Sequence, residues 1–358
     1  MPKPNNKSLS VSKGTERSDS VNPNFRAKKH SLKPVNVYVE GIRSGDRTLL
    51  SQAITLIESS KPEYREIGQD VLEACLPDTG NSVRIGITGV PGVGKSTFIE
   101  AMGKHLIGKG HKLAVLTIDP SSSRSKGSIL GDKTRMTELS SSEQAFIRPS
   151  PTSGTLGGVA QRTRETMLLC EAAGYDTIFV ETVGVGQSET TVHSMVDYFL
   201  LLMLAGAGDE LQGIKRGIME MADLIAINKA EGENIRPAEQ AGREYKNALS
   251  LFPPSPSGVK TEVLTCSALE GTGIEEIWSE INSYMEQTAK SGFFKERRKK
   301  QAAHWMYETI YHRLKESFLN DPDVAKLIPE MEKEVENGTM TSFKAAEKLM
   351  KLFQERSK

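Results

Sequence analysis

The sequence predicts an α/β fold in which helices cover both faces of a mostly parallel sheet, with further helices before it and a helical extension after it. Short apolar stretches alternate with helical patterns through the middle of the chain. Several of these stretches are apolar at nearly every position, which is typical of strands that are covered on both faces. We expect strands at residues 83–88, 112–119, 145–149, 177–181, 198–205, 224–228 and 262–267, and helices between most of them at 95–108, 159–173, 211–221, 237–249 and 274–287.

Composition divides the chain into four expected parts. These are a disordered tail (1–35), an N-terminal helical segment (36–80), a central α/β domain (81–289) and a C-terminal helical extension (290–358). The tail is rich in Ser, Asn, Lys and Pro, so it cannot bury enough apolar surface to offset the entropy of ordering, although its basic character leaves a mitochondrial transit peptide open. In the second part, we expect Asp46 to cap a helix over 48–59 and Pro62 to open one over 62–76.

The C-terminal extension is expected to begin with a helix over 293–318, with turns at 320–322 and 337–338 before two shorter helices. Its apolar residues recur at spacings near three and four, which favours a partner face or a homodimer face. They are Phe293, Phe294, Trp305, Met306, Tyr307, Ile310, Tyr311 and Leu314. The basic run at 297–300 could suggest RNA, but a solvated helix face explains it more simply.

Composition also excludes several functional classes. The 46 basic residues balance 46 acidic ones, so no global field favours nucleic acid or an anionic membrane. The longest apolar run, 198–207, is too short to span a bilayer, and the N-terminus lacks the apolar region of a secretory signal. Cys75, Cys170 and Cys266 lie far apart without a CxxC motif, which favours buried thiols over disulfides or zinc. We therefore expect a cytoplasmic protein that binds neither nucleic acid nor membrane.

A phosphate-binding motif lies at the start of the central domain. The segment from Gly89 to Ser96 has the pattern GxxxxGKS, directly after an expected strand and at the start of a helix, as the motif requires. Its backbone N–H groups would form an anion nest at the positive end of that helix. We expect Lys95 to contact the β- and γ-phosphates and Ser96 to ligate Mg²⁺. The expected nucleotide contacts here are Gly89, Val90, Pro91, Gly92, Val93, Gly94, Lys95, Ser96 and Thr97.

Acidic residues follow two other expected strands. Asp119 ends the second strand, and Glu181 ends the strand that leads into Gly184. Since nucleotide sites in open α/β sheets lie beyond the carboxyl ends of the strands, these acids are expected beside the phosphate-binding loop. There they would hold Mg²⁺ or its water, and the Gly184 N–H would meet the γ-phosphate.

Two further strand ends carry residues that resemble guanine-reading elements. Asn228, Lys229 and Glu231 resemble the NKxD element of GTPases, in which the carboxylate accepts hydrogen bonds from the N1 and N2 donors of guanine. Here Glu stands where Asp is usual, and its extra methylene group shifts the carboxylate. The segment with Ser267, Ala268 and Leu269 resembles the loop whose backbone N–H groups contact the guanine O6 atom.

Longer sequence strings resemble one family, the methylmalonyl-CoA mutase-associated GTPases of the MeaB/ArgK group. They are LTIDPSS at 116–122, SILGDKTRM at 128–136, ETVGVGQSE at 181–189 and AGAGDELQGIK at 205–215. The resemblance implies a GTPase that binds GTP, GDP and Mg²⁺ and forms a homodimer through its C-terminal helices. It also implies a chaperone for adenosylcobalamin-dependent acyl-CoA mutases that assists cofactor loading, protection and reactivation, with methylmalonyl-CoA mutase as the expected partner.

The resemblance also implies roles for single residues. Asp119 and Asp132 would lie near Mg²⁺ in a first switch region, with Glu181 as the Walker B acid, and 209–215 would sense the mutase. Gln187 is a candidate to position the attacking water, by analogy with other GTPases, but a structural role for it stays open. The expected catalytic residues are thus Lys95, Asp119, Asp132, Glu181 and Gln187, and the expected metal ligands are Ser96, Asp119, Asp132 and Glu181.

Two other functions remain open at this point. A small-molecule kinase also uses a phosphate-binding loop with strand-end acids, although it rarely needs to read guanine. A nickel-delivery GTPase would need Cys and His ligands near the nucleotide, whereas His105, His111 and His193 each stand alone in the sequence.

Overall fold

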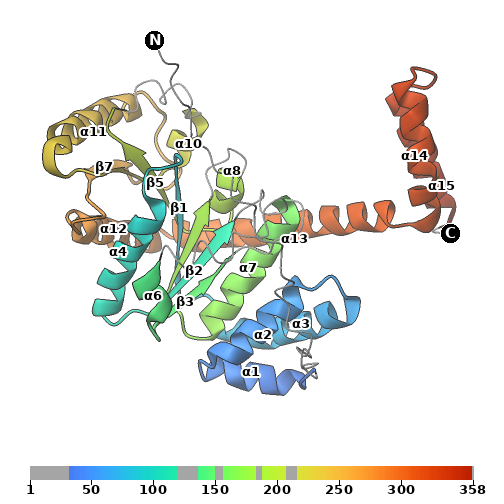
Figure 1. Ribbon diagram of the computed structural model, residues 1–358, viewed down its shortest axis with the longest axis horizontal. Coiled ribbons are helices and arrows are strands. Elements are labelled where there is room, and N and C mark those ends of the chain that lie inside the picture. Colours follow the sequence, from blue (N-terminus) through green and yellow to red (C-terminus); the bar gives the residue numbers. More distant parts are fainter. Residues whose placement is uncertain (1–31, 119–135, 150–155, 183–187, 207–215, 357–358) are drawn as a thin grey trace, which may run out of the picture. The chain divides into compact units, whose positions relative to one another are not determined.

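The centre of the protein is a seven-stranded sheet with the strand order β3-β2-β4-β1-β5-β6-β7 (Figure 1). The computed structural model describes residues 32–118, 136–149, 156–182, 188–206 and 216–356. Every neighbouring pair of strands in this sheet is parallel. The strands are β1 (Val83–Gly89), β2 (Leu113–Ile118), β3 (Ala145–Arg148), β4 (Thr177–Thr182), β5 (Tyr198–Leu204), β6 (Leu224–Asn228) and β7 (Glu262–Thr265). Because all are parallel, their carboxyl ends share one edge of the sheet.

Helices pack on both faces of this sheet. Ile178 and Val180 of β4 lie in one apolar cluster with the first helices of the chain, whereas Phe179 between them lies in a second cluster on the opposite face. The helices are α1 (Val35–Arg43), α2 (Arg47–Glu58), α3 (Pro62–Cys75), α4 (Lys95–Gly108), α6 (Thr137–Ser141), α7 (Leu156–Ala172), α8 (Ser188–His193), α10 (Arg216–Met221), α11 (Ile235–Leu249), α12 (Ile274–Ser291), α13 (Phe293–Leu319), α14 (Pro322–Glu336) and α15 (Ser342–Arg356), with 3-10 turns η1 (Leu76–Asp78) and η2 (Gly232–Asn234).

The predicted α/β fold is confirmed, and every expected strand is present with ends that agree to within two residues. The expected helix at 211–221 is described only from Arg216, because 207–215 lie outside the described residues. The short helices α6 and α8 had no sequence prediction. The expected disordered tail also lies outside the described residues, apart from residues 32–35, the last of which begins α1.

Helix α1 lies, apart from its first residue, within the segment 36–80 that was expected to be helical, although no separate helix was predicted there. Val35, Val37 and Val39 alternate with other residues, and β-branched residues at a period of two favour a strand. The structure instead forms a helix that buries Tyr38, Val39 and Ile42 against the neighbouring helices. Tertiary packing therefore overrides the local preference of this segment.

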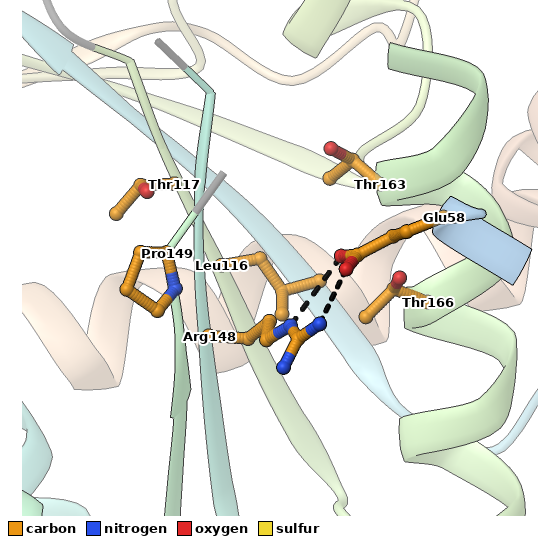
Figure 2. Close-up of a pocket in the computed structure, with 7 residues that line it drawn as sticks. All are labelled: Glu58, Leu116, Thr117, Arg148, Pro149, Thr163 and Thr166. Atoms are coloured by element: carbon orange, nitrogen blue, oxygen red, sulfur yellow. Dashed lines mark hydrogen bonds and ion pairs between the residues drawn. The ribbon is translucent and has the colours of Figure 1, made fainter. Parts of the chain in front are cut away.

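The N-terminal helices join the sheet at the carboxyl ends of β2 and β3. Asp46 caps α2 as predicted, since its side chain accepts hydrogen bonds from the N–H groups of Thr48 and Leu49 at 2.8 and 3.0 Å. At the other end of α2, Glu58 forms an ion pair with Arg148, the last residue of β3 (Figure 2). The pair borders a water-sized cavity of about 10 Å³ that Thr117 and Thr166 also line.

The C-terminal extension is helical, as predicted, and its apolar residues fall into two groups. Trp305 is buried in the cluster that contains residues of α7 and α8, so it packs within its own chain. The prediction that Trp305 belongs to a partner face is therefore wrong. Most of the others are exposed: Met306, Tyr307, Ile310, Tyr311 and Leu314. Beyond them, α14 packs against α15, and Phe318 contacts Phe353 edge-to-face with ring centroids 5.3 Å apart.

The three cysteines are free and buried, which confirms the expected thiols. Burial raises the pKa of Cys266 to about 12, so this thiol is protonated at neutral pH. Among the described helices, none combines the length and apolar character that crossing a membrane requires.

Candidate nucleotide-binding site

The loop between β1 and α4 has the geometry of a phosphate-binding loop. Gly89 ends β1 at a point where an added Cβ atom would lie 2.5 Å from the carbonyl oxygen of Leu202. Gly94 caps α4 with a φ of +93°, a conformation that favours glycine. The loop can therefore turn its N–H groups toward one centre at the N-terminus of α4. Ser96 and Thr97 follow in the first turn of that helix.

Lys95 lies over this loop. Its Nζ atom donates hydrogen bonds to the carbonyl oxygens of Gly89 at 2.8 Å and Val90 at 3.4 Å. Burial lowers the pKa of Lys95, while the carboxylates of Glu181 and Glu189 act in the opposite direction. The ammonium group is thus partly desolvated, which strengthens its attraction for a phosphate.

Glu181 lies directly beside the strand that enters the loop. In the register of the parallel pair, Glu181 of β4 is opposite Ile87 of β1. The next residue, Thr182, donates a hydrogen bond from its hydroxyl to that of Thr88 at 2.8 Å. Glu181 is buried. A buried carboxylate next to Lys95 and the start of α4 fits the hard oxygen ligands that Mg²⁺ prefers.

Glu189 is a candidate site residue that the sequence analysis did not select. It lies in the first turn of α8, is buried, and acts electrostatically on Lys95. It was part of the ETVGVGQSE string but received no role, because neither spacing nor composition distinguishes it from an exposed helix-start carboxylate. Its proximity to Lys95 depends on the long-range placement of α8.

The two loops that resemble guanine-reading elements meet the phosphate-binding loop at Asn228. Its Nδ2 atom donates to the carbonyl oxygen of Val93 at 2.8 Å, and its Oδ1 atom accepts from the N–H of Ala268 at 3.1 Å. Lys229, with a φ of +60°, donates from Nζ to the carbonyl oxygen of Gly92 at 2.9 Å. One asparagine therefore ties together three loops that are far apart in the sequence.

Glu231 is held by the last of these loops. The hydroxyl of Ser267 donates a hydrogen bond to its carboxylate, and the N–H of Glu270 donates to the Ser267 oxygen at 3.0 Å. Leu269 is largely exposed beside them. This hydrogen bond uses one of the two carboxylate oxygens of Glu231.

The structure thus brings Lys95, Glu181, Asn228 and Glu231 to one edge of the sheet, together with their neighbouring loop residues. Four other predicted site residues lie outside the described residues: Asp119, Asp132, Gly184 and Gln187. The roles of all these residues stay predictions. Within the described part of the chain, no group of three or more His, Cys, Asp or Glu side chains could hold a metal ion.

This fold, with its glycine-rich loop between β1 and α4, is that of the P-loop GTPases. Residues 50–323 match the sequence profile of the family described as methylmalonyl-CoA mutase-associated GTPase MeaB. The chain belongs to this family, as the resemblance of its motifs predicted.

Several relatives are similar over most of their length. A probable GTPase of Mycobacterium tuberculosis is 48% identical over 326 residues, which cover 91% of this chain and 97% of that protein. The mitochondrial methylmalonic aciduria type A homolog of Mus musculus is 46% identical, with 88% of this chain and 79% of that protein covered. A crystal structure described as LAO/AO transport system kinase is 39% identical, covers 90% of this chain and all of that one, and has a TM-score of 0.72.

Proposed function

We propose that this protein hydrolyses GTP with Mg²⁺ and uses this cycle to assist an adenosylcobalamin-dependent acyl-CoA mutase, with methylmalonyl-CoA mutase as the expected client. The observation that most directly supports GTP hydrolysis is the pair of hydrogen bonds of Asn228. They join the phosphate-binding loop to both loops that resemble guanine-reading elements. The family and its methylmalonic aciduria type A relatives support the mutase as partner.

In this proposal, each described residue has a separate task. Lys95 neutralises charge on the β- and γ-phosphates, and the loop N–H groups orient them. Ser96 and Glu181, with Asp119 and Asp132, would hold Mg²⁺, which offsets the charge that develops on the transferred phosphoryl group. Glu231 accepts hydrogen bonds from guanine, and the N–H groups near Ala268 meet its O6 atom. Gln187 is the candidate that orients the attacking water.

The partner proposal is tested by phosphate release from GTP, with and without a purified adenosylcobalamin-dependent methylmalonyl-CoA mutase. We expect slow release that the mutase accelerates, and no acceleration of the variant Lys95→Ala. Release that is identical with and without the mutase would leave the hydrolase in place but remove this client.

We also propose a homodimer that forms through the exposed apolar stripe of α13, comprising Met306, Tyr307, Ile310, Tyr311 and Leu314. Two of these rings, Tyr307 and Tyr311, already stack with centroids 6.5 Å apart. Light scattering should give twice the chain mass for the native protein and about the chain mass for Ile310→Lys, whereas Lys299→Glu, a change at an exposed position of the same helix, should stay dimeric. A dimeric Ile310→Lys protein would refute the stripe as the interface.

A small-molecule kinase remains the second candidate, because one structurally similar relative is described as a transport system kinase. The two functions differ in where the phosphate goes. Labelled γ-phosphate that appears on an organic acceptor, and not as free phosphate, would favour the kinase.

A further inference from the structure

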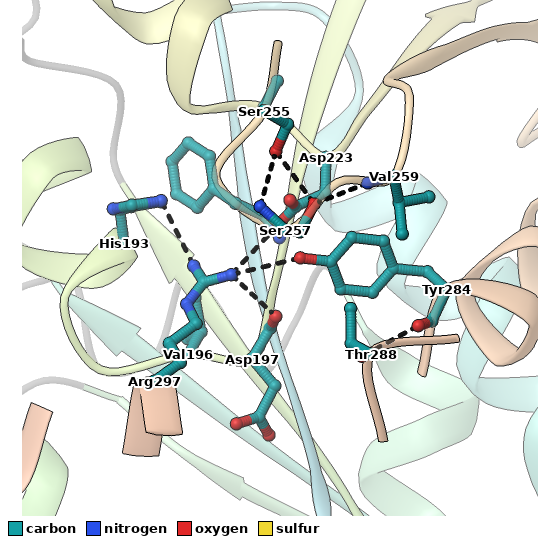
Figure 3. A network of polar contacts seen from close by, with 12 residues as sticks. His193, Val196, Asp197, Asp223, Ser255, Ser257, Val259, Tyr284, Thr288 and Arg297 are labelled. Atoms are coloured by element: carbon teal, nitrogen blue, oxygen red, sulfur yellow. Dashed lines mark hydrogen bonds and ion pairs between the residues drawn. The ribbon is translucent and has the colours of Figure 1, made fainter. Parts of the chain in front are cut away.

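Helix α13 attaches to the rest of the chain through the segment that joins α8 to β5. The Gln301 side chain donates from Nε2 to the carbonyl oxygen of Val196 at 2.8 Å, and the Trp305 indole N–H donates to that of Ser194 at 3.2 Å. Arg297 contacts the same segment at its two ends, through the His193 ring at 3.2 Å and the Asp197 carbonyl oxygen at 3.1 Å (Figure 3). Three side chains along one face of α13 therefore contact four of the five residues in the segment 193–197.

These contacts are directional and at least partly buried. Trp305 is 4% exposed and Gln301 is 8% exposed, and the hydrogen bond from Gln301 is buried whereas that from Trp305 is partly buried. Arg298 adds a two-pronged ion pair to Asp197, with distances of 2.8 and 2.6 Å. The other function of Asp197 is to accept a hydrogen bond from the backbone N–H of Arg84 at 2.9 Å, in the strand that leads to the phosphate-binding loop. Removing one partner from such a buried hydrogen bond lowers stability more than removing a solvent-exposed contact does.

The other end of α8 reaches the candidate nucleotide site. Ser188 and Glu189 in its first turn are buried, and Glu189 acts electrostatically on Lys95. The helix has six residues, so it spans about 9 Å. Because His193 lies about one helical turn after Glu189, we expect a displacement of the 193–197 segment to shift Glu189.

We propose that the inner face of α13 sets the position of α8, so that Trp305, Gln301 and Arg297 act as positioning residues for GTP hydrolysis through Glu189. This inference rests on the proposed GTP hydrolysis. None of the three side chains is expected to touch the nucleotide. Their effect is on the geometry around Lys95. In this proposal the C-terminal extension supports GTP hydrolysis in addition to offering a candidate partner surface.

A purely structural function of these contacts predicts a different result. If these contacts only anchored α13, weakening them would lower stability or loosen the extension. The turnover number for GTP hydrolysis would not change. If they position α8, the turnover number falls while the affinity for GTP, which depends on the phosphate-binding and base loops, is retained. The separation of kcat from the dissociation constant therefore distinguishes the two.

The test uses the full-length chain with conservative replacements. Trp305→Phe keeps an aromatic six-membered ring but removes the pyrrole part of the indole with its N–H, and Gln301→Met keeps the length of the side chain but removes its donor. Lys300→Met, at an exposed neighbouring position, is the matched control. For each protein, we would measure the dissociation constant of a fluorescent GTP analogue, single-turnover GTP hydrolysis and the melting temperature.

We expect Trp305→Phe and Gln301→Met to lower the hydrolysis rate by roughly threefold to tenfold, the effect of one lost buried hydrogen bond, with affinity within twofold of the native protein. Lys300→Met should match the native rate. In a double-mutant cycle, the double variant Glu189→Gln with Trp305→Phe should lower the hydrolysis rate by less than the product of the two single effects. The reason is that both changes would act through the position of Glu189.

Unchanged hydrolysis in both α13 variants, or independent effects in the cycle, would overturn the inference while leaving the hydrolase intact. A parallel loss of affinity, rate and melting temperature would also overturn it, because it would indicate a structural anchor only. If the native chain does not hydrolyse GTP at all, it is the proposed function that fails, and the two failures are therefore distinguishable.

Discussion

Asn228 holds the Val93 carbonyl oxygen through a hydrogen bond of 2.8 Å, although 135 residues separate the two in the sequence. Asn228 ends β6 and Val93 belongs to the loop after β1, so the bond crosses the carboxyl edge of the sheet past β5. Both partners are buried. Because the same asparagine also accepts from the Ala268 N–H, it aligns the phosphate-binding loop with the base-side loop.

Replacing this asparagine should therefore impair nucleotide binding beyond the loss of a single contact. In Asn228→Ala, the Val93 carbonyl and the Ala268 N–H both lose their partner, and we expect the affinity for GTP to fall by about tenfold to a hundredfold. Titration with a fluorescent GTP analogue measures this. Asn247→Ala, at an exposed position of α11, serves as the control and should bind like the native protein. An affinity within twofold of native for Asn228→Ala would contradict the bridging role.

Base selectivity should depend on the Glu231 carboxylate. Glu231→Gln replaces one acceptor oxygen by a donor group, so we expect the preference for GTP over ATP to fall by at least about tenfold. Ser267→Ala frees the carboxylate from its hydrogen bond and should give a smaller loss. Competition binding with GTP, ITP and ATP separates the loss of the guanine N2 contact from a general loss. Glu233→Gln, an exposed neighbour, should retain full selectivity; equal loss in it would argue against Glu231.

The sequence was sufficient to predict the sheet and the edge where the site lies. Strands such as 224–228 are apolar runs bounded by turn residues, and a parallel sheet places their following loops together whatever the details of packing. The segment with Asn228 and the segment with Ser267 could thus be assigned to the same site as Lys95 before their contacts were known.

Other features depend on long-range packing and had no local signal. Trp305 and Met306 are neighbours in an amphipathic helix, yet the first is buried against α7 and α8 and the second is half exposed. Periodicity shows that the helix has an apolar face but not which part of it the chain itself covers. Glu189 similarly became a candidate only when the placement of α8 was known.

Stability should depend strongly on a buried ion pair at the opposite edge of the sheet. Arg84 and Glu171 lie 2.8 Å apart and are 7% and 1% exposed. Burial opposes ionisation, but the hydrogen bond and charge of Arg84 hold the pKa of Glu171 below its usual value. Arg84→Met leaves this carboxylate buried without its cationic partner and should lower the free energy of unfolding by about 3–5 kcal/mol.

Urea unfolding of Arg84→Met and of a surface control measures that cost. Arg43→Met breaks the exposed pair with Asp78, whose charged atoms lie 2.7 Å apart, and should cost much less stability than Arg84→Met because solvent screens that pair. Equal losses for the two variants would contradict the assignment of stability to the buried pair.

His193 predicts a specific pH dependence. Burial and the positive charge of Arg297 lower the pKa of His193 to about 4, whereas in the unfolded chain it is about 6.5. Since the unfolded state binds the proton more readily, this residue's contribution to stability is fully present above about pH 6.5 and is lost as the pH falls toward 4.

The variant His193→Gln removes this titration but keeps an acceptor for Arg297. The drop in melting temperature between pH 7 and pH 5 should therefore be smaller in His193→Gln than in the native protein. An identical drop in both proteins would mean that the proton uptake on unfolding comes from other groups.

The most direct test of the central claim is phosphate release by the full-length chain with Mg²⁺ and either GTP or ATP, in parallel with Lys95→Ala. The account predicts release from GTP well above that from ATP and no release above background for Lys95→Ala. Equal release from the two nucleotides, or release that survives the loss of Lys95, would contradict a guanine-specific hydrolase at this site.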